Sequence, residues 1–331
     1  MPWDDLIGNK RIKNVLASYL KNDVIPYSMI FSGPPAADKL GFASAFARSV
    51  NCLELEDDYC GRCRHCVEIE KEIFPDLKVL KPGGQFYKKE QITFLIEDNF
   101  RRPLKGRRKI YILNDVQRMN ENAANAFLKV LEEPAESSVF ILLTHNLIGL
   151  LATLKSRCQV LNFTLPSLSE TRSFLLGNGY DGEKAELIGH LAQSGLAELM
   201  DGHFDELMEK RSQVRLVLIK LIKKREIEDV LLDLYHRSRS REKFIEYFKE
   251  LVHLISLMLR DIMILKIDIA SDFIINIDYR DILLELGEYV TIPKVLGLIR
   301  GMELLYRDIH RNLNTRVLIL EFIKNYTIRE V

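Results

Sequence analysis

Four of the five cysteines lie close together in the stretch CLELEDDYCGRCRHC. Cys52, Cys60, Cys63 and Cys66 follow the pattern C-x7-C-x2-C-x2-C, and four thiolates with such spacing can surround a Zn²⁺ ion at about 2.3 Å. Gly61 permits the tight turn between two of these ligands. Because all four ligands would come from the protein, no position stays open for water, and the pattern predicts a structural zinc rather than a catalytic one.

Other chemistry remains open for this cluster. The alternatives are metal-free buried cysteines, a redox pair and an iron–sulfur cluster. We expect His65 to be a surface residue and not a fifth ligand, and Cys158, far away in the sequence, to be an ordinary buried thiol. Clustered cysteines of this kind are typical of metal binding in a reducing cytoplasm, which is where we expect the protein to act.

A second candidate site is the stretch SGPPAADKL, which follows an apolar run and precedes a helical pattern. Gly33 and Lys39 fit the phosphate-binding pattern G-x-x-x-x-G-K-[ST], but Asp38 replaces its second glycine and Leu40 its hydroxyl residue. The Asp38 carboxylate would stand where phosphate oxygens should lie. At about 5 Å and an effective dielectric of about 20, two like charges repel by roughly 3 kcal/mol.

The acidic pair that should complete a nucleotide site is also altered. Asn114 and Asp115 follow the apolar run KIYIL, where an Mg²⁺-binding aspartate and a water-activating glutamate would be expected. The pattern therefore favours a degenerate site that does not bind ATP. A site that still binds nucleotide weakly, and a lysine unrelated to nucleotides, are the alternatives.

Both candidate sites lie in a region where strands and helices alternate. Apolar runs at 27–31, 76–80, 109–113, 138–143 and 159–163 predict strands, and 89–100 and 121–133 predict helices, the second capped by Asn120. Such alternation predicts an α/β domain, with a mainly parallel sheet covered by helices, over residues 1–165. After Pro166 the pattern is helical, apart from a possible strand at 272–277.

Composition excludes several classes of protein. The 331 residues carry 47 basic and 47 acidic side chains, so no overall positive field attracts nucleic acid. The amino-terminal sequence does not look like a secretion signal. The apolar stretch 251–270 is interrupted by charges, which favours a buried helix over a membrane span. The basic run RRPLKGRRK at 101–109 predicts a solvated surface, with DNA-backbone contact as the alternative.

In this order, the degenerate loop, the four-cysteine insertion, NAFLKVLEEP (125–134) and SRC (156–158) resemble the AAA+ clamp-loader subunits of bacterial DNA polymerase III. The likeness is strongest to the delta-prime type, and it is strong over residues 1–165 and weaker beyond. The segment 312–323 is similar to the last collar helix of that family.

This resemblance implies a RecA-like AAA+ domain at 1–165 with a zinc insertion at 52–66. A helical lid domain at 166–206 and a helical collar domain at 207–331 would follow. In the family, the collar joins five subunits into a ring that opens and loads the sliding clamp onto primed DNA. Delta-prime subunits typically do not hydrolyse ATP, and Leu196 stands here where active relatives carry a nucleotide-contacting arginine.

The resemblance also gives a role to the SRC motif, which is intact as Ser156, Arg157 and Cys158. In active relatives this arginine reaches into the neighbouring subunit's site and stabilises charge on the γ-phosphate, an effect worth about 10³–10⁵ in rate. We therefore expect Arg157 to act in trans. The alternative is that Arg157 simply pairs with a local carboxylate.

The sequence thus favours a non-catalytic clamp-loader subunit with one structural zinc, without bound ATP or intrinsic ATPase activity. The rival within the same loader is an active ATPase motor subunit, which Lys39 favours. A third possibility is a zinc-dependent nucleic-acid binder unrelated to clamp loading, against which the neutral net charge argues.

Overall fold

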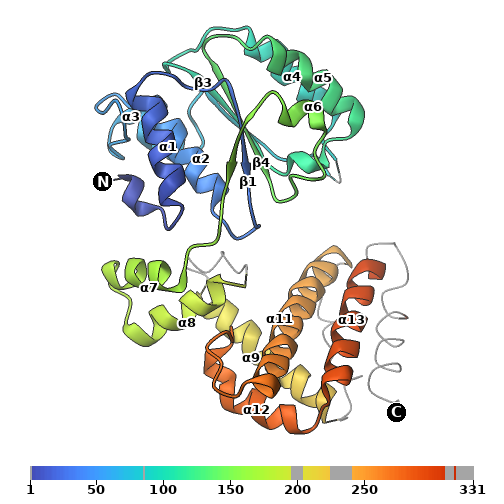
Figure 1. The fold of residues 1–331 in the computed structure, drawn as a ribbon. Helices are drawn as coiled ribbons and strands as arrows, with labels where there is room; N and C mark the ends of the chain where they lie inside the picture. Colours follow the sequence, from blue (N-terminus) through green and yellow to red (C-terminus); the bar gives the residue numbers. More distant parts are fainter. Residues whose placement is uncertain (1, 85, 195–203, 224–240, 310–316, 318–331) are drawn as a thin grey trace. The chain divides into compact units, whose positions relative to one another are not determined.

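The computed structural model describes residues 2–84, 86–194, 204–223, 241–309 and 317 (Figure 1). The chain divides into two compact units, Met1–Asn178 and Gly179–Val331. The sheet and the cysteine cluster both belong to the first unit, unit 1.

Unit 1 is built on a five-stranded parallel sheet with the strand order β2-β3-β4-β1-β5. The strands are β1 (Ser28–Ser32), β2 (Leu77–Leu80), β3 (Lys109–Leu113), β4 (Ser138–Thr144) and β5 (Gln159–Asn162). Each coincides with a predicted strand to within one residue at either end. The predicted parallel α/β architecture is confirmed.

Helices cover both faces of this sheet (Figure 1). One face carries α1 (Lys10–Lys21), α2 (Lys39–Val50) and α3 (Arg64–Glu70), and the other carries α4 (Lys89–Asn99), α5 (Glu121–Glu132) and α6 (Ala152–Lys155). Short 3₁₀ helices η1 (Pro2–Asp5) and η2 (Val116–Arg118) and the helix α7 (Leu168–Gly177) complete the unit.

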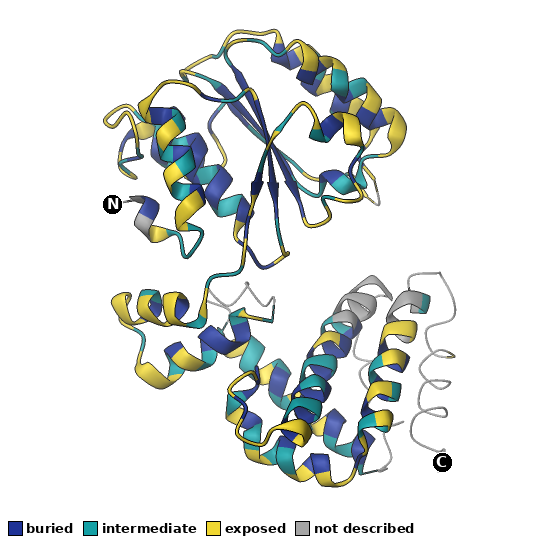
Figure 2. Cartoon of the chain, in the orientation of Figure 1, coloured by how far each residue is buried: buried dark blue, intermediate teal, exposed yellow. Residues whose placement is uncertain are grey.

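The burial of the strands explains why they read as continuous apolar runs. Every residue of β1, β3 and β4 is buried (Figure 2). Along β1, Met29 and Phe31 pack with the core on the α2 side, whereas Ile30 packs with the core on the α5 side. Because successive side chains of a strand point to opposite faces, a sheet covered twice needs apolar residues at every position.

Helix ends follow local capping rules. The side chain of Asn120 accepts a hydrogen bond from Ala123 N at 2.8 Å, which confirms the predicted cap of α5. Ser167 and Glu170 form a capping box at the start of α7, in which each side chain binds the other residue's backbone N–H.

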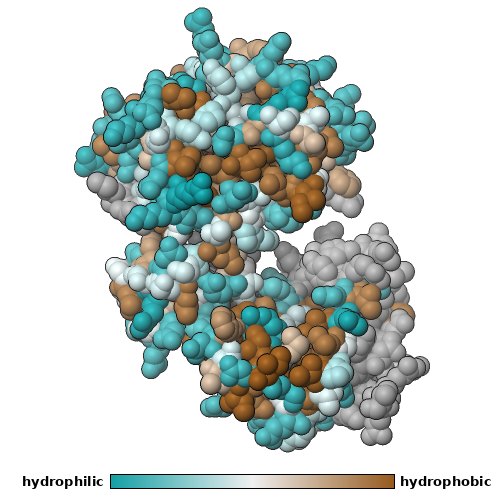
Figure 3. Space-filling view, viewed as in Figure 1, coloured by the Kyte–Doolittle hydropathy of each residue, from teal (hydrophilic) through white to brown (hydrophobic). Residues whose placement is uncertain are grey.

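The second unit, unit 2, is helical where it is described. Its elements are α8 (Gly182–Ala192), α9 (Phe204–Ile222), α11 (Arg241–Ile267), η4 (Ile277–Tyr279), α12 (Arg280–Glu288) and α13 (Ile292–Ile309). The core gathers around α11, whose Ile255, Met258 and Ile262 are fully buried among residues of α9, α12 and α13. Large apolar side chains are exposed at the end of α11 and in the segment that follows it, including Ile267, Ile269 and Phe273. Figure 3 shows apolar surface on this unit.

The possible strand at 272–277 is absent. The segment instead runs as irregular chain into η4. Its backbone N–H groups at Ile275 and Asn276 are bound by the buried carboxylate of Asp261, at 3.0 and 2.8 Å, so no neighbouring strand is needed.

Two sequence expectations lie outside the described residues, namely Leu196 and, apart from Val317, the segment 312–323. The boundary between a lid at 166–206 and a collar at 207–331 stays a prediction. No helix in the described part of the chain combines the length and the hydrophobicity that spanning a bilayer requires.

Candidate phosphate loop, metal centre and arginine site

The candidate phosphate loop joins β1 to α2 at the carboxyl end of a central strand. Gly33 begins the loop and lies against the chain that leaves β5. A Cβ atom at Gly33 would stand 2.6 Å from the carbonyl oxygen of Phe163, closer than real Cβ contacts allow. Glycine is therefore required here for close packing.

Lys39 is buried and points back into its own loop. Its Nζ donates hydrogen bonds to the carbonyl oxygens of Gly33 at 2.9 Å, Pro34 and Ala37 at 3.4 Å. Burial lowers the pKa of Lys39, while the nearby carboxylates of Asp115 and Asp38 act in the opposite direction. The loop thus satisfies this ammonium with its own backbone.

Asp38 caps α2. Its Oδ1 accepts a hydrogen bond from the backbone N–H of Gly41 at 2.8 Å. A Cβ at Gly41 would lie 2.0 Å from Asp38 Oδ2, so only glycine leaves room for this cap. Leu40 is half-buried and packs against the core on the α2 side. The carboxylate therefore occupies the helix end where a phosphate-binding loop would present free N–H groups.

Asn114 and Asp115 lie at the carboxyl end of β3. The Asn114 carbonyl oxygen accepts a hydrogen bond from the buried Tyr87 hydroxyl. Asp115 adopts the left-handed conformation, with φ of 51°, and accepts a hydrogen bond from Gln117 Nε2 at 2.9 Å. Its Oδ1 also lies 3.5 Å from His145 Nδ1.

Three further polar residues, Gln117, Thr144 and His145, join this group, and no sequence motif marks them. Thr144, the last residue of β4, donates from Oγ1 to Gln117 Oε1 at 2.7 Å, while Gln117 Nε2 lies 3.0 Å from His145 Nδ1. Gln117, Thr144 and His145 therefore anchor Asp115 beside the phosphate loop. Only their position after two parallel strands could have suggested this role.

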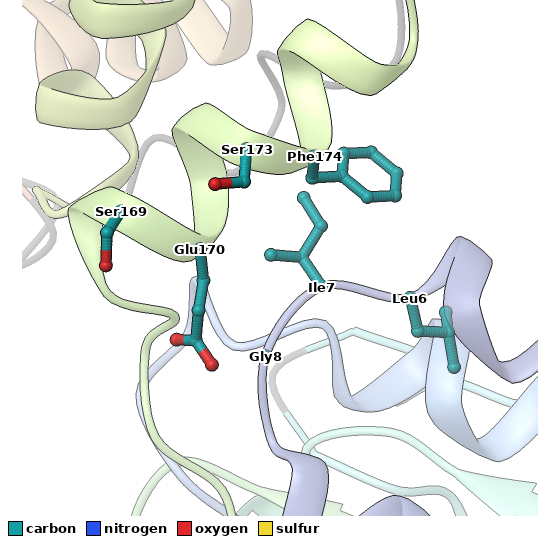
Figure 4. A pocket seen from close by; sticks show the side chains of 7 residues that line it. All are labelled: Leu6, Ile7, Gly8, Ser169, Glu170, Ser173 and Phe174. Atoms are coloured by element: carbon teal, nitrogen blue, oxygen red, sulfur yellow. The ribbon is translucent and has the colours of Figure 1, made fainter.

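A hollow of about 360 Å³ lies between the amino-terminal segment and α7 (Figure 4). It is lined by Leu6, Ile7 and Gly8 on one side and by Ser169, Glu170, Ser173 and Phe174 on the other. The wall is mostly apolar, with a few polar groups at its edge. Hydrogen bonds from Ser167 to the carboxylate of Glu170 lower the pKa of that side chain.

The segment that leaves β5 connects this hollow with the phosphate loop. Asn9 Nδ2 donates to Thr164 O at 2.9 Å, and Asn9 Oδ1 accepts from Thr164 N at 2.9 Å. Gly8 has a φ of +67°, and a Cβ there would stand 2.9 Å from Pro166 Cβ. The hollow and the loop thus contact the same short segment, Gly8 touching it at Pro166 and Gly33 at Phe163.

The four predicted metal ligands come together. The Sγ atoms of Cys52, Cys60, Cys63 and Cys66 all lie within 4.8 Å of one another. A tetrahedral zinc site with Zn–S bonds of about 2.3 Å has sulfur atoms about 3.8 Å apart, so the cluster fits Zn²⁺ with small movements. Gly61 has a φ of +69°, as the expected tight turn requires.

Backbone N–H groups point at the sulfurs, as thiolate ligands require. Cys63 N lies 3.2 Å from Cys60 Sγ, and Cys66 N lies 3.4 Å from Cys63 Sγ. Burial alone would raise the pKa of Cys63, but hydrogen bonds from the backbone N–H groups of Leu53 and Cys66 outweigh it and lower that pKa to about 7. Burial raises the pKa of the Cys66 thiol.

His65 is not part of the cluster. Its Nδ1 lies 2.9 Å from the carbonyl oxygen of Asn51, and its ring packs on Phe74 with centroids 4.9 Å apart. It is half-buried rather than a free surface residue. The cluster instead contacts the amino terminus through Tyr59, whose ring stands edge-on to Trp3 at 6.3 Å and lies 4.0 Å below the Arg48 guanidinium.

Arg157 follows α6 and lies at the surface of unit 1. Its Nη2 is 2.5 Å from Glu132 Oε1, at the end of α5, and its Nη1 donates to Thr153 O at 3.1 Å and to Ser156 Oγ at 3.4 Å. Pairing with a local carboxylate, the alternative that the sequence left open, is therefore what the single chain does. Cys158 is half-buried, and burial raises the pKa of its thiol to about 11.

The basic run 101–109 folds around an acidic residue. The buried carboxylate of Asp76 accepts hydrogen bonds from the backbone N–H groups of Leu104, Lys105 and Gly106, at 2.7–2.8 Å. Arg107 pairs with Asp23 at 2.7 Å, and Lys105 pairs with Glu68 at 3.1 Å.

One member of the basic run points inward. Lys109 is buried, and its Nζ lies 2.8 Å from the carboxylate of Asp98. These contacts fit the predicted solvated surface for most of the run and give Lys109 a structural role.

Comparisons with known proteins agree with these features. A family model described as "DNA polymerase III, delta subunit" matches residues 8–167. The delta-prime subunit of DNA polymerase III from Bacillus subtilis is 26% identical over 324 residues, covering 93% of each chain. The tau/gamma subunit of Haemophilus influenzae is 34% identical over 169 residues, which are 51% of this chain and 24% of that subunit.

A solved structure shares the fold. The gamma subunit-related protein of Thermotoga maritima aligns with a TM-score of 0.51 and 18% identity, covering 97% of this chain and 98% of that one. At this identity the likeness concerns the fold, which is of the RecA-like AAA+ type. With the sequence motifs and the near full-length match to a delta-prime subunit, these findings confirm that the chain resembles the clamp-loader subunits of DNA polymerase III, among them delta-prime and tau/gamma.

Proposed function

We propose that this chain is a non-catalytic subunit of a DNA polymerase III clamp loader, and that it donates Arg157 to the ATP site of a neighbouring subunit. It helps to load the sliding clamp onto primed DNA without binding ATP itself. Its partners are the other subunits of a hetero-pentameric ring in the cytoplasm. Residues 1–165 form the AAA+ domain, 166–206 the lid and 207–331 the collar that joins the ring.

The observation that carries this proposal is the contrast between two charged sites in unit 1. At the phosphate loop, Lys39 Nζ is bound by backbone carbonyls and the Asp38 carboxylate caps α2. Negative charge at that position opposes a triphosphate. The guanidinium of Arg157, by contrast, lies at the surface, with 34% of its side chain exposed.

The chemistry of Arg157 suits a role in trans. A guanidinium keeps its charge at every physiological pH and can bridge two phosphate oxygens. Its backbone is fixed, because Ser28 Oγ donates a hydrogen bond to the Arg157 carbonyl oxygen at 2.8 Å. The side chain can therefore extend from a rigid base toward a neighbour.

Zinc has a structural role in this proposal. Cys52, Cys60, Cys63 and Cys66 would hold one Zn²⁺ ion, and four thiolate ligands leave no position for water or substrate. Since Tyr59 within the insertion contacts Trp3, the metal would stiffen the insertion and the amino-terminal segment together.

The test is the substitution Arg157→Ala in a loader reconstituted with its ATPase subunits. We expect ATP turnover at the neighbour's site to fall by about 10³-fold or more, so that the total ATPase rate drops, while the complex still assembles, because an arginine finger contributes on this scale to the site that it completes. Arg172→Ala, at an exposed position of α7, is the matched control. An unchanged ATPase rate in an intact complex overturns the proposal.

The second candidate function is that of an active ATPase motor in the same loader. Lys39 is retained, and the hollow between Leu6–Gly8 and α7 contacts the same segment as the phosphate loop. Titration of the isolated chain with a fluorescent ATP analogue distinguishes the two functions. Micromolar affinity supports the motor, whereas the non-catalytic subunit should not bind in this range.

A further inference from the structure

The partner of Arg157 in the single chain is a carboxylate, and its position is specific. Glu132 is the last residue of α5, and its Oε1 lies 2.5 Å from Arg157 Nη2. The same guanidinium is held on its other nitrogen by Thr153 O at 3.1 Å. Both terminal nitrogens of the arginine are therefore engaged before any neighbour arrives.

The pair faces a hollow that is open to solvent. A cavity of about 500 Å³ is lined by Arg157, Glu132 and Glu133, together with Tyr27 and Gln159. The Glu132 side chain is 49% exposed, so this ion pair stands at the surface and not within the core. An ion pair as exposed as this one is weak and exchanges readily with another anion.

A carboxylate and a phosphate make the same demands on a guanidinium. Each is an anion that offers two oxygen atoms to the paired N–H groups of an arginine. A phosphate that approaches Arg157 must therefore take the place that Glu132 now fills. Because the Arg157 carbonyl is held by Ser28, the exchange needs only a movement of the side chain.

We propose that Glu132 is the resting counter-ion of Arg157, and that the phosphate of a neighbouring subunit's ATP displaces it. Glu132 is thus a positioning residue: it keeps Arg157 folded onto its own subunit until a competing anion is present. This inference rests on the proposed donation of Arg157 in trans. Breaking the ion pair between Glu132 and Arg157 costs free energy, which the binding of the neighbour's nucleotide must offset.

The test is Glu132→Gln in the reconstituted loader, with ATP as the varied substrate. The amide keeps the size of the side chain and removes its charge, so ATP no longer competes with an anion for Arg157. We expect the KM for ATP to fall about two- to fivefold, the range that the strength of an exposed ion pair permits, with kcat unchanged. A merely structural role of Glu132 would lower kcat or assembly and would not lower KM.

Two controls separate the possible results. Glu133→Gln removes a charge from the adjacent position of the same hollow and should leave KM at the wild-type value. In the double variant Glu132→Gln/Arg157→Ala, the effect of the first substitution on KM should vanish, because the two residues act as one pair.

The results also distinguish this inference from the proposed function. If Arg157→Ala lowers the ATPase rate while Glu132→Gln matches the wild type in KM, Arg157 is donated but Glu132 does not compete for it. If Arg157→Ala leaves the ATPase rate unchanged, the donation itself is wrong and the inference falls with it. A lower KM that persists in the double variant also overturns the inference.

Discussion

The carboxylate of Asp38 accepts a hydrogen bond from the backbone N–H of Gly41, at 2.8 Å, and closes the amino end of α2. In nucleotide-binding loops, free N–H groups at this end of the helix bind phosphate. Here a side chain of the loop itself takes that place. The loop is therefore complete without a ligand.

Replacing Asp38 by Asn tests whether the charge excludes nucleotide. Asn and Asp are about equally good helix caps, so the free energy of unfolding, measured by thermal unfolding, should change by less than about 0.5 kcal/mol. The affinity for a fluorescent ATP analogue should rise, by up to about a hundredfold, because the substitution removes a repulsion of roughly 3 kcal/mol. Equal affinity in both proteins would show that the carboxylate is not the barrier.

Metal analysis should find one zinc per chain, and its removal should be visible in Trp3. Trp3 is the only tryptophan in the chain, and its ring lies 6.3 Å from that of Tyr59 within the cysteine insertion. We expect a strong chelator to shift the tryptophan fluorescence and to lower the melting temperature. Cys158→Ser, outside the cluster, should keep the zinc. A metal-free chain with the same fluorescence and melting temperature would contradict the site.

The buried pair of Asp98 and Lys109 should make stability depend on acid pH. Burial alone would raise the pKa of Asp98, but hydrogen bonds from Lys109 and Tyr111 outweigh it, so the pKa lies below its ordinary value of 3.8. The pair therefore stabilises the fold fully above the unfolded-state pKa, and this contribution is lost as the pH falls through the lower folded-state pKa.

Asp98→Asn should consequently lower the free energy of unfolding by about 3 kcal/mol at neutral pH, because it leaves a buried ammonium without its counter-ion. The difference between the variant and the wild type should shrink at a pH near the folded-state pKa. Urea unfolding at several pH values measures it. Glu97→Gln, at the exposed neighbouring position, is the control and should have little effect. If the difference in unfolding free energy between the wild type and Asp98→Asn does not change with pH, the charge of Asp98 is not its cause.

Asp76 should hold the basic loop in shape. Three backbone N–H groups donate to its carboxylate, so Asp76→Ala leaves them without an acceptor and should cost about 3 kcal/mol. Hydrogen exchange at Leu104, Lys105 and Gly106 should become faster. Glu68→Gln removes the charge from two partly exposed ion pairs, with Lys105 and with Arg64, and should cost less than about 1 kcal/mol. If hydrogen exchange at these three residues is unchanged in Asp76→Ala, Asp76 does not hold the basic loop in shape.

Local signals in the sequence were sufficient for the sheet and the cysteine cluster. A doubly covered parallel strand is a continuous apolar run, and each of the five runs became a strand. The cysteine spacing and Gly61 act over a few residues, so the cluster could be predicted in the same way. The cap of α5 by Asn120 could be predicted for the same reason, because it too depends on a few neighbouring residues.

Polar contacts between distant segments could not be predicted. Glu132 and Arg157 are 25 residues apart, and nothing periodic links them. Arg211 shows the same limit in unit 2: it is fully buried, it forms an ion pair with Asp278 at 2.6 Å, and it donates a hydrogen bond to Asn276 Oδ1 at 2.9 Å. The apolar run at 272–277 led to a wrong strand prediction, because the carboxylate of Asp261 accepts hydrogen bonds from the backbone N–H groups of this segment.

The bond between Asn9 and Thr164 has a practical consequence for shortened versions of the chain. One side-chain amide binds both backbone groups of a residue 155 positions away, just before α7 begins. Removing the residues before position 10 would therefore also remove the contacts that hold the segment after β5, where Pro166 packs on Gly8. A fragment meant to carry unit 1 alone must start before Leu6 and extend through α7.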